Sequence, residues 1–285
     1  MKMEQQKSEH ILIIGGPDAG KTHFGGQLYG RLQSRLGAYK ITSPPENLTV
    51  FKEVLENLNE GRSAGHTNVS ANEVLELNLA DSEGGATSLK FPDYGGEQVN
   101  TIVTDRRINK VWVDQLRVST SWMLFIRPDR LPVIEDIVNR GLPEQKILEQ
   151  RSKEETPMKL SASAFYIELL QILLYAQKTA AGYADSPRLV VTLSCWDLIE
   201  EVDKKKMPVE ILKEKAPALS AFIESTWPQN HVVIGLSSTE RTLSLTEADM
   251  DFVKRGPEDF GFLITPQGVL EKDLTVSIKI LLGKN

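Results

Sequence analysis

A glycine-rich segment near the start of the sequence could bind a phosphate. Residues 15–22 read Gly-Gly-Pro-Asp-Ala-Gly-Lys-Thr, which matches the pattern G-x-x-x-x-G-K-[ST] and directly follows the apolar run 11–14. Glycines allow successive backbone N–H groups to surround a phosphate at a helix N-terminus, where the helix dipole favours negative charge. Lys21 would add a cation between the β- and γ-phosphates, and the Thr22 hydroxyl would bind Mg²⁺. The predicted phosphate-binding residues are Gly15, Gly16, Pro17, Asp18, Ala19, Gly20, Lys21, Thr22 and His23.

A possible site for magnesium and the γ-phosphate follows the expected strand 87–91. Asp93 and Gly96 form the pattern D-x-x-G, in which the aspartate reaches Mg²⁺ through water and the glycine N–H meets the γ-phosphate. The pattern is common by chance. Its position at the end of an expected strand favours a functional role.

Two further segments could recognise a nucleotide base. Asp197 follows the apolar run 189–194, where its carboxylate could accept both N1–H and N2–H of guanine, a donor pair that adenine lacks. The same aspartate could instead serve only as the N-cap of a helix that begins at Leu198. Ser237 and Ser238 close the last apolar run, where a short loop could present backbone N–H groups to the guanine O6.

The elements that must position these residues alternate between short apolar runs and longer helical patterns. This order predicts an α/β fold with a mostly parallel, six-stranded sheet that carries helices on both faces. The expected strands are 10–15, 73–79, 87–91, 121–126, 189–194 and 232–236, and the expected helices are 21–36, 97–116, 161–179, 209–225 and 270–282.

Three stretches are longer than a compact sheet needs. They are residues 40–61, 128–159 and 238–267, and we interpret them as insertions in a single domain that spans residues 1–285. Connections of this length usually serve function or partner contact. The second stretch could equally be a surface helical hairpin.

The composition argues against several classes of protein. With 33 Lys and Arg against 39 Asp and Glu, the net charge is −6, which disfavours nucleic acid as a partner. The single cysteine, Cys195, excludes a disulfide framework and a cysteine-based zinc site, and the four histidines lack metal-ligand spacing. No signal peptide, membrane span or lipidation motif is evident, so we expect a cytoplasmic protein without a membrane partner.

Taken together, the motifs resemble those of the Ras-like and translation-factor GTPases, the TRAFAC class of P-loop proteins. The resemblance spans residues 11–282 and implies a P-loop NTPase fold, GTP as substrate and Mg²⁺ as cofactor. In that class a switch threonine lies before the second strand and closes over Mg²⁺ and the γ-phosphate. Thr67 lies at the expected place, with Ser70 as a rival hydroxyl. The long stretch from Thr22 to Thr67 resembles bacterial GTPases of the double-GTPase group, which is associated with multigene conflict or signalling systems and implies a role in bacterial defence.

One departure from these motifs concerns the base. The class usually reads N-K-x-D or T-K-x-D where this sequence reads Ser194-Cys195-Trp196-Asp197, so the lysine is absent. In the class its stem stacks on the base and its head ties the loop to the P-loop. We expect Cys195 to lie beside the base. Without the lysine, we expect the protein to have a weaker preference for guanine. Trp196 could replace the stacking surface, although a core tryptophan is the favoured interpretation.

The other departure concerns hydrolysis. Glu97 stands where small GTPases carry the glutamine that orients the attacking water, and Gln98 could take over that role. A carboxylate can accept a hydrogen bond from water but cannot donate one to the transferring phosphoryl group, so the chemistry should be slower. Arg62, ahead of Thr67 on the same segment, is the candidate for an arginine that stabilises the transition state.

The sequence therefore predicts a Mg²⁺-dependent GTP-binding and GTP-hydrolysing switch. Its segments 61–68 and 93–99 would order around the γ-phosphate. These segments and the insertions would contact a protein effector or companion subunit. One alternative is an ATP-using P-loop protein in which Asp93 or Asp129 acts as the metal-binding acid. The other is a scaffold that holds nucleotide with little hydrolysis.

Overall fold

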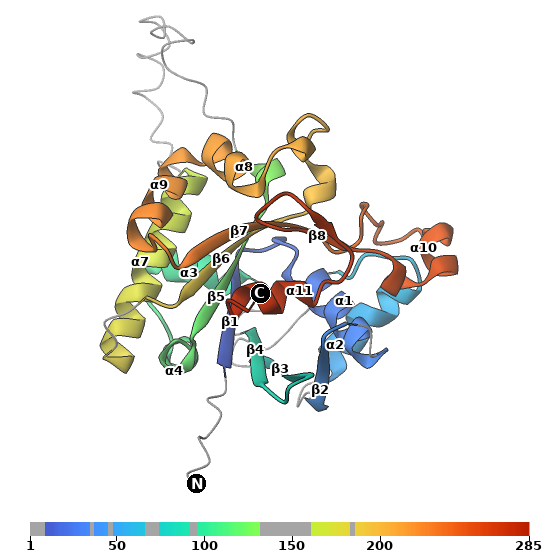
Figure 1. Ribbon diagram of the computed structural model, residues 1–285, viewed down its shortest axis with the longest axis horizontal. Coiled ribbons are helices and arrows are strands. Elements are labelled where there is room, and N and C mark those ends of the chain that lie inside the picture. Colours follow the sequence, from blue (N-terminus) through green and yellow to red (C-terminus); the bar gives the residue numbers. More distant parts are fainter. Residues whose placement is uncertain are drawn as a thin grey trace, which may run out of the picture.

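The computed structural model describes residues 9–34, 37–44, 48–65, 74–91, 96–131, 161–182 and 186–284. In these ranges one sheet of nine strands has the order β2-β3-β4-β1-β5-β6-β7-β8-β9 (Figure 1). The strands are β1 (Glu9–Gly15), β2 (Tyr39–Ser43), β3 (Leu75–Asp81), β4 (Ala86–Phe91), β5 (Ser121–Ile126), β6 (Arg188–Ser194), β7 (His231–Ser237), β8 (Phe262–Ile264) and β9 (Leu270–Glu271).

The centre of the sheet is parallel. Strands β4, β1, β5, β6 and β7 pair in parallel, whereas β2, β3, β8 and β9 join through antiparallel pairs. Every residue of β5 is buried, as is the run from Ile11 to Gly15 in β1, as expected for strands that are covered on both faces. The predicted α/β fold is confirmed, and the sheet is mostly parallel in its core.

The expected number of six strands is wrong, because β2, β8 and β9 extend the sheet at its two edges. These strands lie within or beside two stretches that the sequence marks only as insertions. Strand β2 is largely exposed and β8 and β9 contain three and two residues, so none of them carries a clear apolar pattern.

Helices cover both faces of the sheet, and two hydrophobic cores result (Figure 1). The first core contains side chains of α1, α2, α10 and α11, and the second contains side chains of α3, α4, α7, α8 and α9. The helices are α1 (Lys21–Gln33), α2 (Leu48–Asn59), α3 (Glu97–Asp105), α4 (Lys110–Val118), α7 (Ala162–Ala181), α8 (Pro208–Lys215), α9 (Pro217–Thr226), α10 (Met250–Arg255) and α11 (Val276–Leu281).

Three of the expected helices are each two separate elements in the structure. The expected helix 97–116 is α3 and α4, because Arg106 ends α3 in a left-handed conformation (φ 53°) and Asn109 caps the start of α4. The expected helix 209–225 is α8 and α9, because Pro217 begins a new helix after the non-helical Ala216. The C-terminal expectation, 270–282, is strand β9 followed by α11.

Two of the three insertions contain elements of their own. The stretch 40–61 contains most of β2 and all of α2, which packs so closely on α1 that a Cβ at Gly26 would lie 2.4 Å from Val54 Cγ1. The stretch 238–267 contains α10 and β8. Residues 132–159 of the remaining stretch lie outside the described residues.

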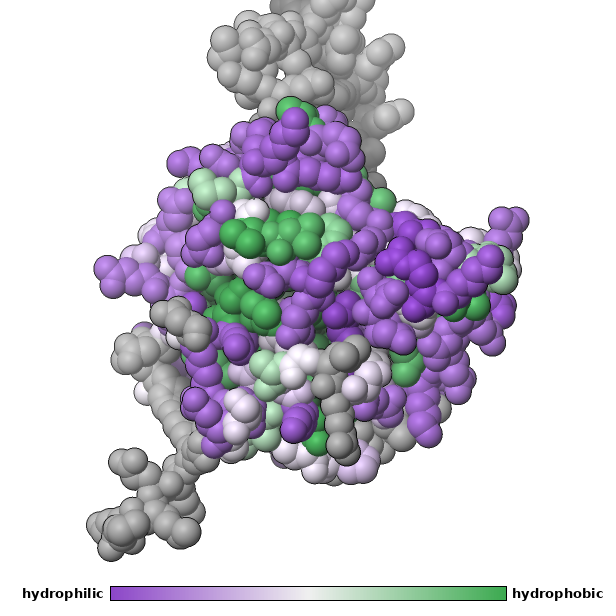
Figure 2. Space-filling view, turned by 45° about the vertical axis from the view of Figure 1, so that its right-hand side comes forward, coloured by the Kyte–Doolittle hydropathy of each residue, from purple (hydrophilic) through white to green (hydrophobic). Residues whose placement is uncertain are grey.

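The visible surface is mostly hydrophilic, with separate apolar patches between the polar side chains (Figure 2). Within the described ranges, no helix has both the length and the apolar character needed to cross a membrane. The carboxyl ends of the parallel strands meet at one edge of the sheet, and in open α/β sheets ligands bind at that edge.

Candidate functional site

A cavity of about 520 Å³ opens at the carboxyl ends of the parallel strands. Its wall contains residues 18–23 after β1, residues 63–65 before β3, and Glu97 at the start of α3. Residues from 127–130 after β5, 194–198 after β6 and 238–245 after β7 complete the wall. Segments that are distant in the sequence therefore share one space.

The glycine-rich loop after β1 folds around its own lysine. Asp18 and Gly20 adopt left-handed conformations with φ of 54° and 84°, and α1 begins directly after Gly20. The Lys21 ammonium donates hydrogen bonds to the carbonyl oxygens of Gly15 at 2.6 Å and Gly16 at 2.8 Å. Lys21 is only 3% exposed, so this charge lies inside the curve of the loop, where Thr22 also faces the cavity.

The start of α3 lies directly against the glycine-rich loop. A Cβ on Gly96 would lie 2.4 Å from the Gly16 carbonyl carbon and 2.5 Å from the Pro17 nitrogen, and φ at Gly96 is 95°. Only glycine fits both constraints. The next residue, Glu97, is exposed and faces the cavity.

Gln98 lies away from the cavity. Its amide oxygen accepts hydrogen bonds from Trp112 Nε1 and Asn109 Nδ2, each at 3.1 Å. Gln98 thereby joins the start of α3 to α4, and it is not among the cavity-lining residues. The expectation that Gln98 orients an attacking water has no geometric support, because its polar oxygen already accepts two hydrogen bonds from α4.

The loops after β6 and β7 meet through a short hydrogen bond. Ser237 Oγ donates to Asp197 Oδ1 at 2.5 Å and accepts from the Glu240 backbone N–H at 2.9 Å. Ser237 is fully buried, and its side chain makes both of these hydrogen bonds. Asp197 and Ser238 both line the cavity. The Asp197 carboxylate is therefore held in one orientation at the rim.

Trp196 is a core residue, as the favoured interpretation predicted. It is 1% exposed, and a Cβ on Gly235 would lie 2.5 Å from its ring carbon Cε3. The indole therefore packs directly on the backbone of β7 and cannot reach a base in the cavity.

Cys195 is the first residue of the loop after β6, and it faces the glycine-rich loop. It adopts a left-handed conformation with φ of 53°, lines the cavity, and has its sulfur 3.8 Å from the position that a Cβ on Gly20 would take. Burial raises the pKa of the Cys195 thiol to about 11, and the nearby Arg127 charge opposes this rise.

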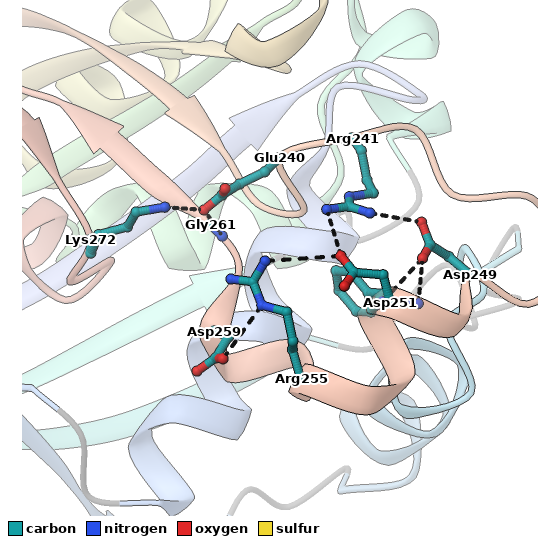
Figure 3. A network of polar contacts seen from close by, with 9 residues as sticks. Glu240, Arg241, Asp249, Asp251, Arg255, Asp259, Gly261 and Lys272 are labelled. Atoms are coloured by element: carbon teal, nitrogen blue, oxygen red, sulfur yellow. Dashed lines mark hydrogen bonds and ion pairs between the residues drawn. The ribbon is translucent and has the colours of Figure 1, made fainter.

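The insertion after β7 forms part of the rim of the cavity. Arg241 pairs with Asp249 at 3.1 Å and Asp251 at 3.2 Å (Figure 3). Its guanidinium lies 4.8 Å from the Phe260 ring centre. Asp249 also caps α10 by accepting from two backbone N–H groups. These contacts hold the insertion in a fixed shape.

The same insertion is tied to the segment before β3 through its backbone. Asp249 N donates to Gly61 O at 2.9 Å, and Ser63 N donates to Ser244 O at 2.8 Å. Ser63 Oγ lies 3.1 Å from His23 Nε2 on α1, and burial lowers the pKa of His23. The segment that leads to the expected switch threonine is therefore anchored on both sides.

The family model described as Double-GTPase 1 matches residues 12–281 of the chain. The chain belongs to the Double-GTPase 1 family. None of the curated proteins compared with the chain matches it.

Solved GTPase structures are similar to this double-GTPase at low sequence identity. A bacterial selenocysteine-specific elongation factor, EF-Sec, is 14% identical with a TM-score of 0.38, over 97% of this chain and 29% of that one. The GTP-bound Ski7 GTPase-like domain of S. cerevisiae is 13% identical with a TM-score of 0.40, over 85% and 47%. The SRb-GTP/SRX complex from Chaetomium thermophilum is 12% identical with a TM-score of 0.36, over 87% and 96%. The chain thus spans less than half of the first two proteins.

The arginines near the cavity are distributed differently from the sequence-based expectation. Arg62 pairs with Glu60 and is not among the cavity-lining residues. Three other arginines, Arg127, Arg130 and Arg241, do line the cavity. Sequence reasoning missed them because no motif contains them. The available signal was the position of Arg127 directly after a buried strand, at the edge where ligands bind.

The expected metal-binding set is only partly described. Thr22 lines the cavity, whereas Thr67, its rival Ser70 and Asp93 lie outside the described residues. Among the residues that are described, no group of three or more His, Cys, Asp or Glu side chains could hold a metal ion.

The pKa of Cys195 gives a testable property of the site. Because the thiolate is the reactive form and the pKa is about 11, only about one thiol in a thousand is ionised at pH 8. We expect the rate of alkylation by iodoacetamide to rise about tenfold per pH unit from pH 8 to pH 10. Mass spectrometry measures the rate, and Cys195→Ser provides the background because the chain has one cysteine. A rate that is already constant above pH 9 would contradict this burial.

Proposed function

We propose that this chain is a Mg²⁺-dependent switch that binds and hydrolyses GTP. The observation that carries the proposal is the shared cavity, where the glycine-rich loop, the Asp197–Ser237 pair and Glu97 lie around one space of about 520 Å³. A phosphate chain, a base and an attacking water need these three kinds of group at separate points of one site.

In this proposal the triphosphate lies along the glycine-rich loop. The loop N–H groups and Lys21 bind the β- and γ-phosphates, and Lys21 exchanges its carbonyl partners Gly15 and Gly16 for phosphate oxygens. The Thr22 hydroxyl at the first turn of α1 is a hard oxygen ligand that suits Mg²⁺. Asp93 and Thr67 complete the metal-binding set on sequence grounds. When bound, Mg²⁺ neutralises charge on the phosphates.

Guanine is the proposed base because of Asp197. Ser237 Oγ donates to the Asp197 carboxylate at 2.5 Å and fixes its orientation. Neither carboxylate oxygen therefore has to move when N1–H and N2–H of guanine bind. Ser238 would present its backbone N–H to the guanine O6. Of the two acids named for the ATP-using alternative, Asp129 accepts two hydrogen bonds from Arg127, and Asp93 lies outside the described residues.

Hydrolysis in this proposal depends on Glu97 and on the glycine next to it. The Gly96 N–H would meet the γ-phosphate from the point where α3 touches the glycine-rich loop, and Glu97 would accept a hydrogen bond from the attacking water. Arg62 would have to leave Glu60 to reach the cavity, so we assign no transition-state role to it.

The proposal also covers the partners of the protein and its location in the cell. Segments 61–68 and 93–99 are the proposed switches, and the insertions are proposed contacts for a protein effector or companion subunit. Leu245 and Met250 support this, because both are large apolar side chains on the insertion after β7 and are 63% and 58% exposed. We propose a cytoplasmic protein of a bacterial conflict system with one domain over residues 1–285.

Nucleotide titration tests the proposal directly. We expect the wild type to bind GTP more tightly than ATP in the presence of Mg²⁺, as measured by calorimetry. Lys21→Met should weaken GTP binding about 100-fold or more, because it removes charge-assisted hydrogen bonds to two phosphates. Lys213→Met on the exposed side of α8 is the matched control. Equal affinity of folded Lys21→Met and wild type would rule out the phosphate site.

Base choice has its own variant. Asp197→Asn should weaken GTP binding about 100-fold and allow xanthosine triphosphate to bind, because the amide N–H₂ pairs with the C2 carbonyl of xanthine. Competition binding with the two nucleotides measures the change, and Asp114→Asn on α4 is the control. Guanine recognition by Asp197 is wrong if GTP affinity is retained in this variant.

The hydrolytic step is tested at Glu97. Wild-type turnover without a partner should be on the order of 10⁻⁴ to 10⁻³ per second. Glu97→Gln should raise it about tenfold, roughly 1.4 kcal/mol of barrier, because the amide can both accept from water and donate to the phosphoryl group. Single-turnover assays at saturating GTP measure the rate, with the exposed Glu201→Gln as control. Wild-type hydrolysis no faster than background would favour the nucleotide-binding scaffold.

A further inference from the structure

Arg127 occupies a position in the cavity that the proposed function leaves unused. It directly follows β5, lines the cavity, and has a side chain that is only 17% exposed. The sequence offers no motif for it. Its surroundings, however, connect the two loops that lie on either side of the expected base.

Asp129 fixes the orientation of this guanidinium. Arg127 Nε donates to Asp129 Oδ1 at 3.0 Å and Arg127 Nη2 donates to Asp129 Oδ2 at 2.5 Å. This two-point contact between a planar guanidinium and a carboxylate restricts rotation of the arginine. The hydrogen bond to Asp129 also raises the pKa of Arg127, so the group keeps its charge. The third nitrogen, Nη1, is thereby directed to the glycine-rich loop.

Arg127 lies next to both neighbouring loops. Its Nη1 donates a long hydrogen bond of 3.5 Å to the carbonyl oxygen of Asp18, whose φ is 54°. On the β6 side, Ser194 Oγ donates to the carbonyl oxygen of Ile126, directly before Arg127, at 3.1 Å, and Cys195 lines the same cavity as Arg127. The Arg127 charge lowers the pKa of the Cys195 thiol, which burial raises. Arg130 binds the Asp18 carboxylate at 3.1 Å, so Asp18 has partners after β5 for both its backbone and its side chain.

Arg127 shares its part of the cavity wall with the expected base-recognition residues Cys195 and Asp197. The register of β5 and β6 pairs Ile126 with Leu193, so Arg127 follows β5 level with the start of the loop 194–197. Gly96, by contrast, meets the glycine-rich loop at Gly16 and Pro17.

We propose that Arg127 is a nucleotide-positioning residue at the base end of the site, where it ties the glycine-rich loop to the loop 194–197 and offers the face of its guanidinium to the purine. The inference rests on the proposed function and deepens it. A planar guanidinium stacks on aromatic rings while its edges donate hydrogen bonds, so one side chain can do both. Arg127, directly after β5, supplies the positive charge that Cys195 does not.

Binding of two nucleotides tests the role. Arg127→Met should weaken GTP and GDP binding by the same factor of about ten, because the contact is with the base end that both share. Arg117→Met on α4 is the matched control, since this arginine is 54% exposed and pairs with Asp114 on the same helix. Calorimetry with Mg²⁺ measures both affinities, after thermal unfolding shows that each variant is folded.

A rescue variant separates a positioning role from a structural one. Cys195→Lys in the Arg127→Met background returns a cation between the two loops and should recover most of the lost affinity for both nucleotides. Asp129→Asn keeps the guanidinium but weakens its clamp, and should give a smaller loss in the same direction. Arg127→Met should also slow alkylation of Cys195 at pH 9, because the charge that lowers the thiol pKa is gone.

The outcomes distinguish this inference from the proposed function. Equal losses for GTP and GDP with rescue by Cys195→Lys support it. Unchanged affinities in folded Arg127→Met, a loss confined to GTP, or a loss without rescue would each overturn it while leaving GTP binding by the wild type intact. A wild type that binds neither nucleotide would overturn the proposed function together with this inference.

Discussion

The structure depends on the burial of strand β1 between β4 and β5. This strand is paired along both edges and covered on both faces, so neither its register nor its end point can shift without exposing apolar side chains to water. The loop after Gly15 therefore starts from a fixed place. The strands on either side end at the same edge, and this shared edge brings the segments after β1, β5, β6 and β7 to one cavity.

Packing next to the cavity maintains the same order. Trp196 lies on the backbone at Gly235 and Gln98 joins α3 to α4, so both residues support the loops rather than face a ligand. Asp197 is held by Ser237 from the neighbouring strand. Side chains that face the cavity are thus oriented by side chains that do not, which is the arrangement that pre-organised binding sites require.

The sequence predicted the parts of the site that follow local rules. The glycine-rich loop and Asp197 each follow a buried strand within a short motif, and strand position carries them to the cavity. The position of Arg127 beside the glycine-rich loop was not predicted, because its contact with the Asp18 carbonyl joins residues more than a hundred positions apart. The edge strands β8 and β9 and the break at Arg106 were missed for a related reason. Short strands lack a periodic pattern, and a left-handed arginine has no compositional signal.

The anchoring of the segment 61–63 to the insertion after β7 has a consequence for sequence drift. Both contacts, from Asp249 to Gly61 and from Ser63 to Ser244, join backbone atoms, so exchanging most side chains there leaves the hydrogen bonds in place. Gly61 is different, because its φ is 69° and a Cβ would lie 2.5 Å from the Asp249 carbonyl oxygen. The exposed side chains of the insertion can therefore change without loss of its attachment to the segment 61–63. That attachment depends on one small residue, Gly61.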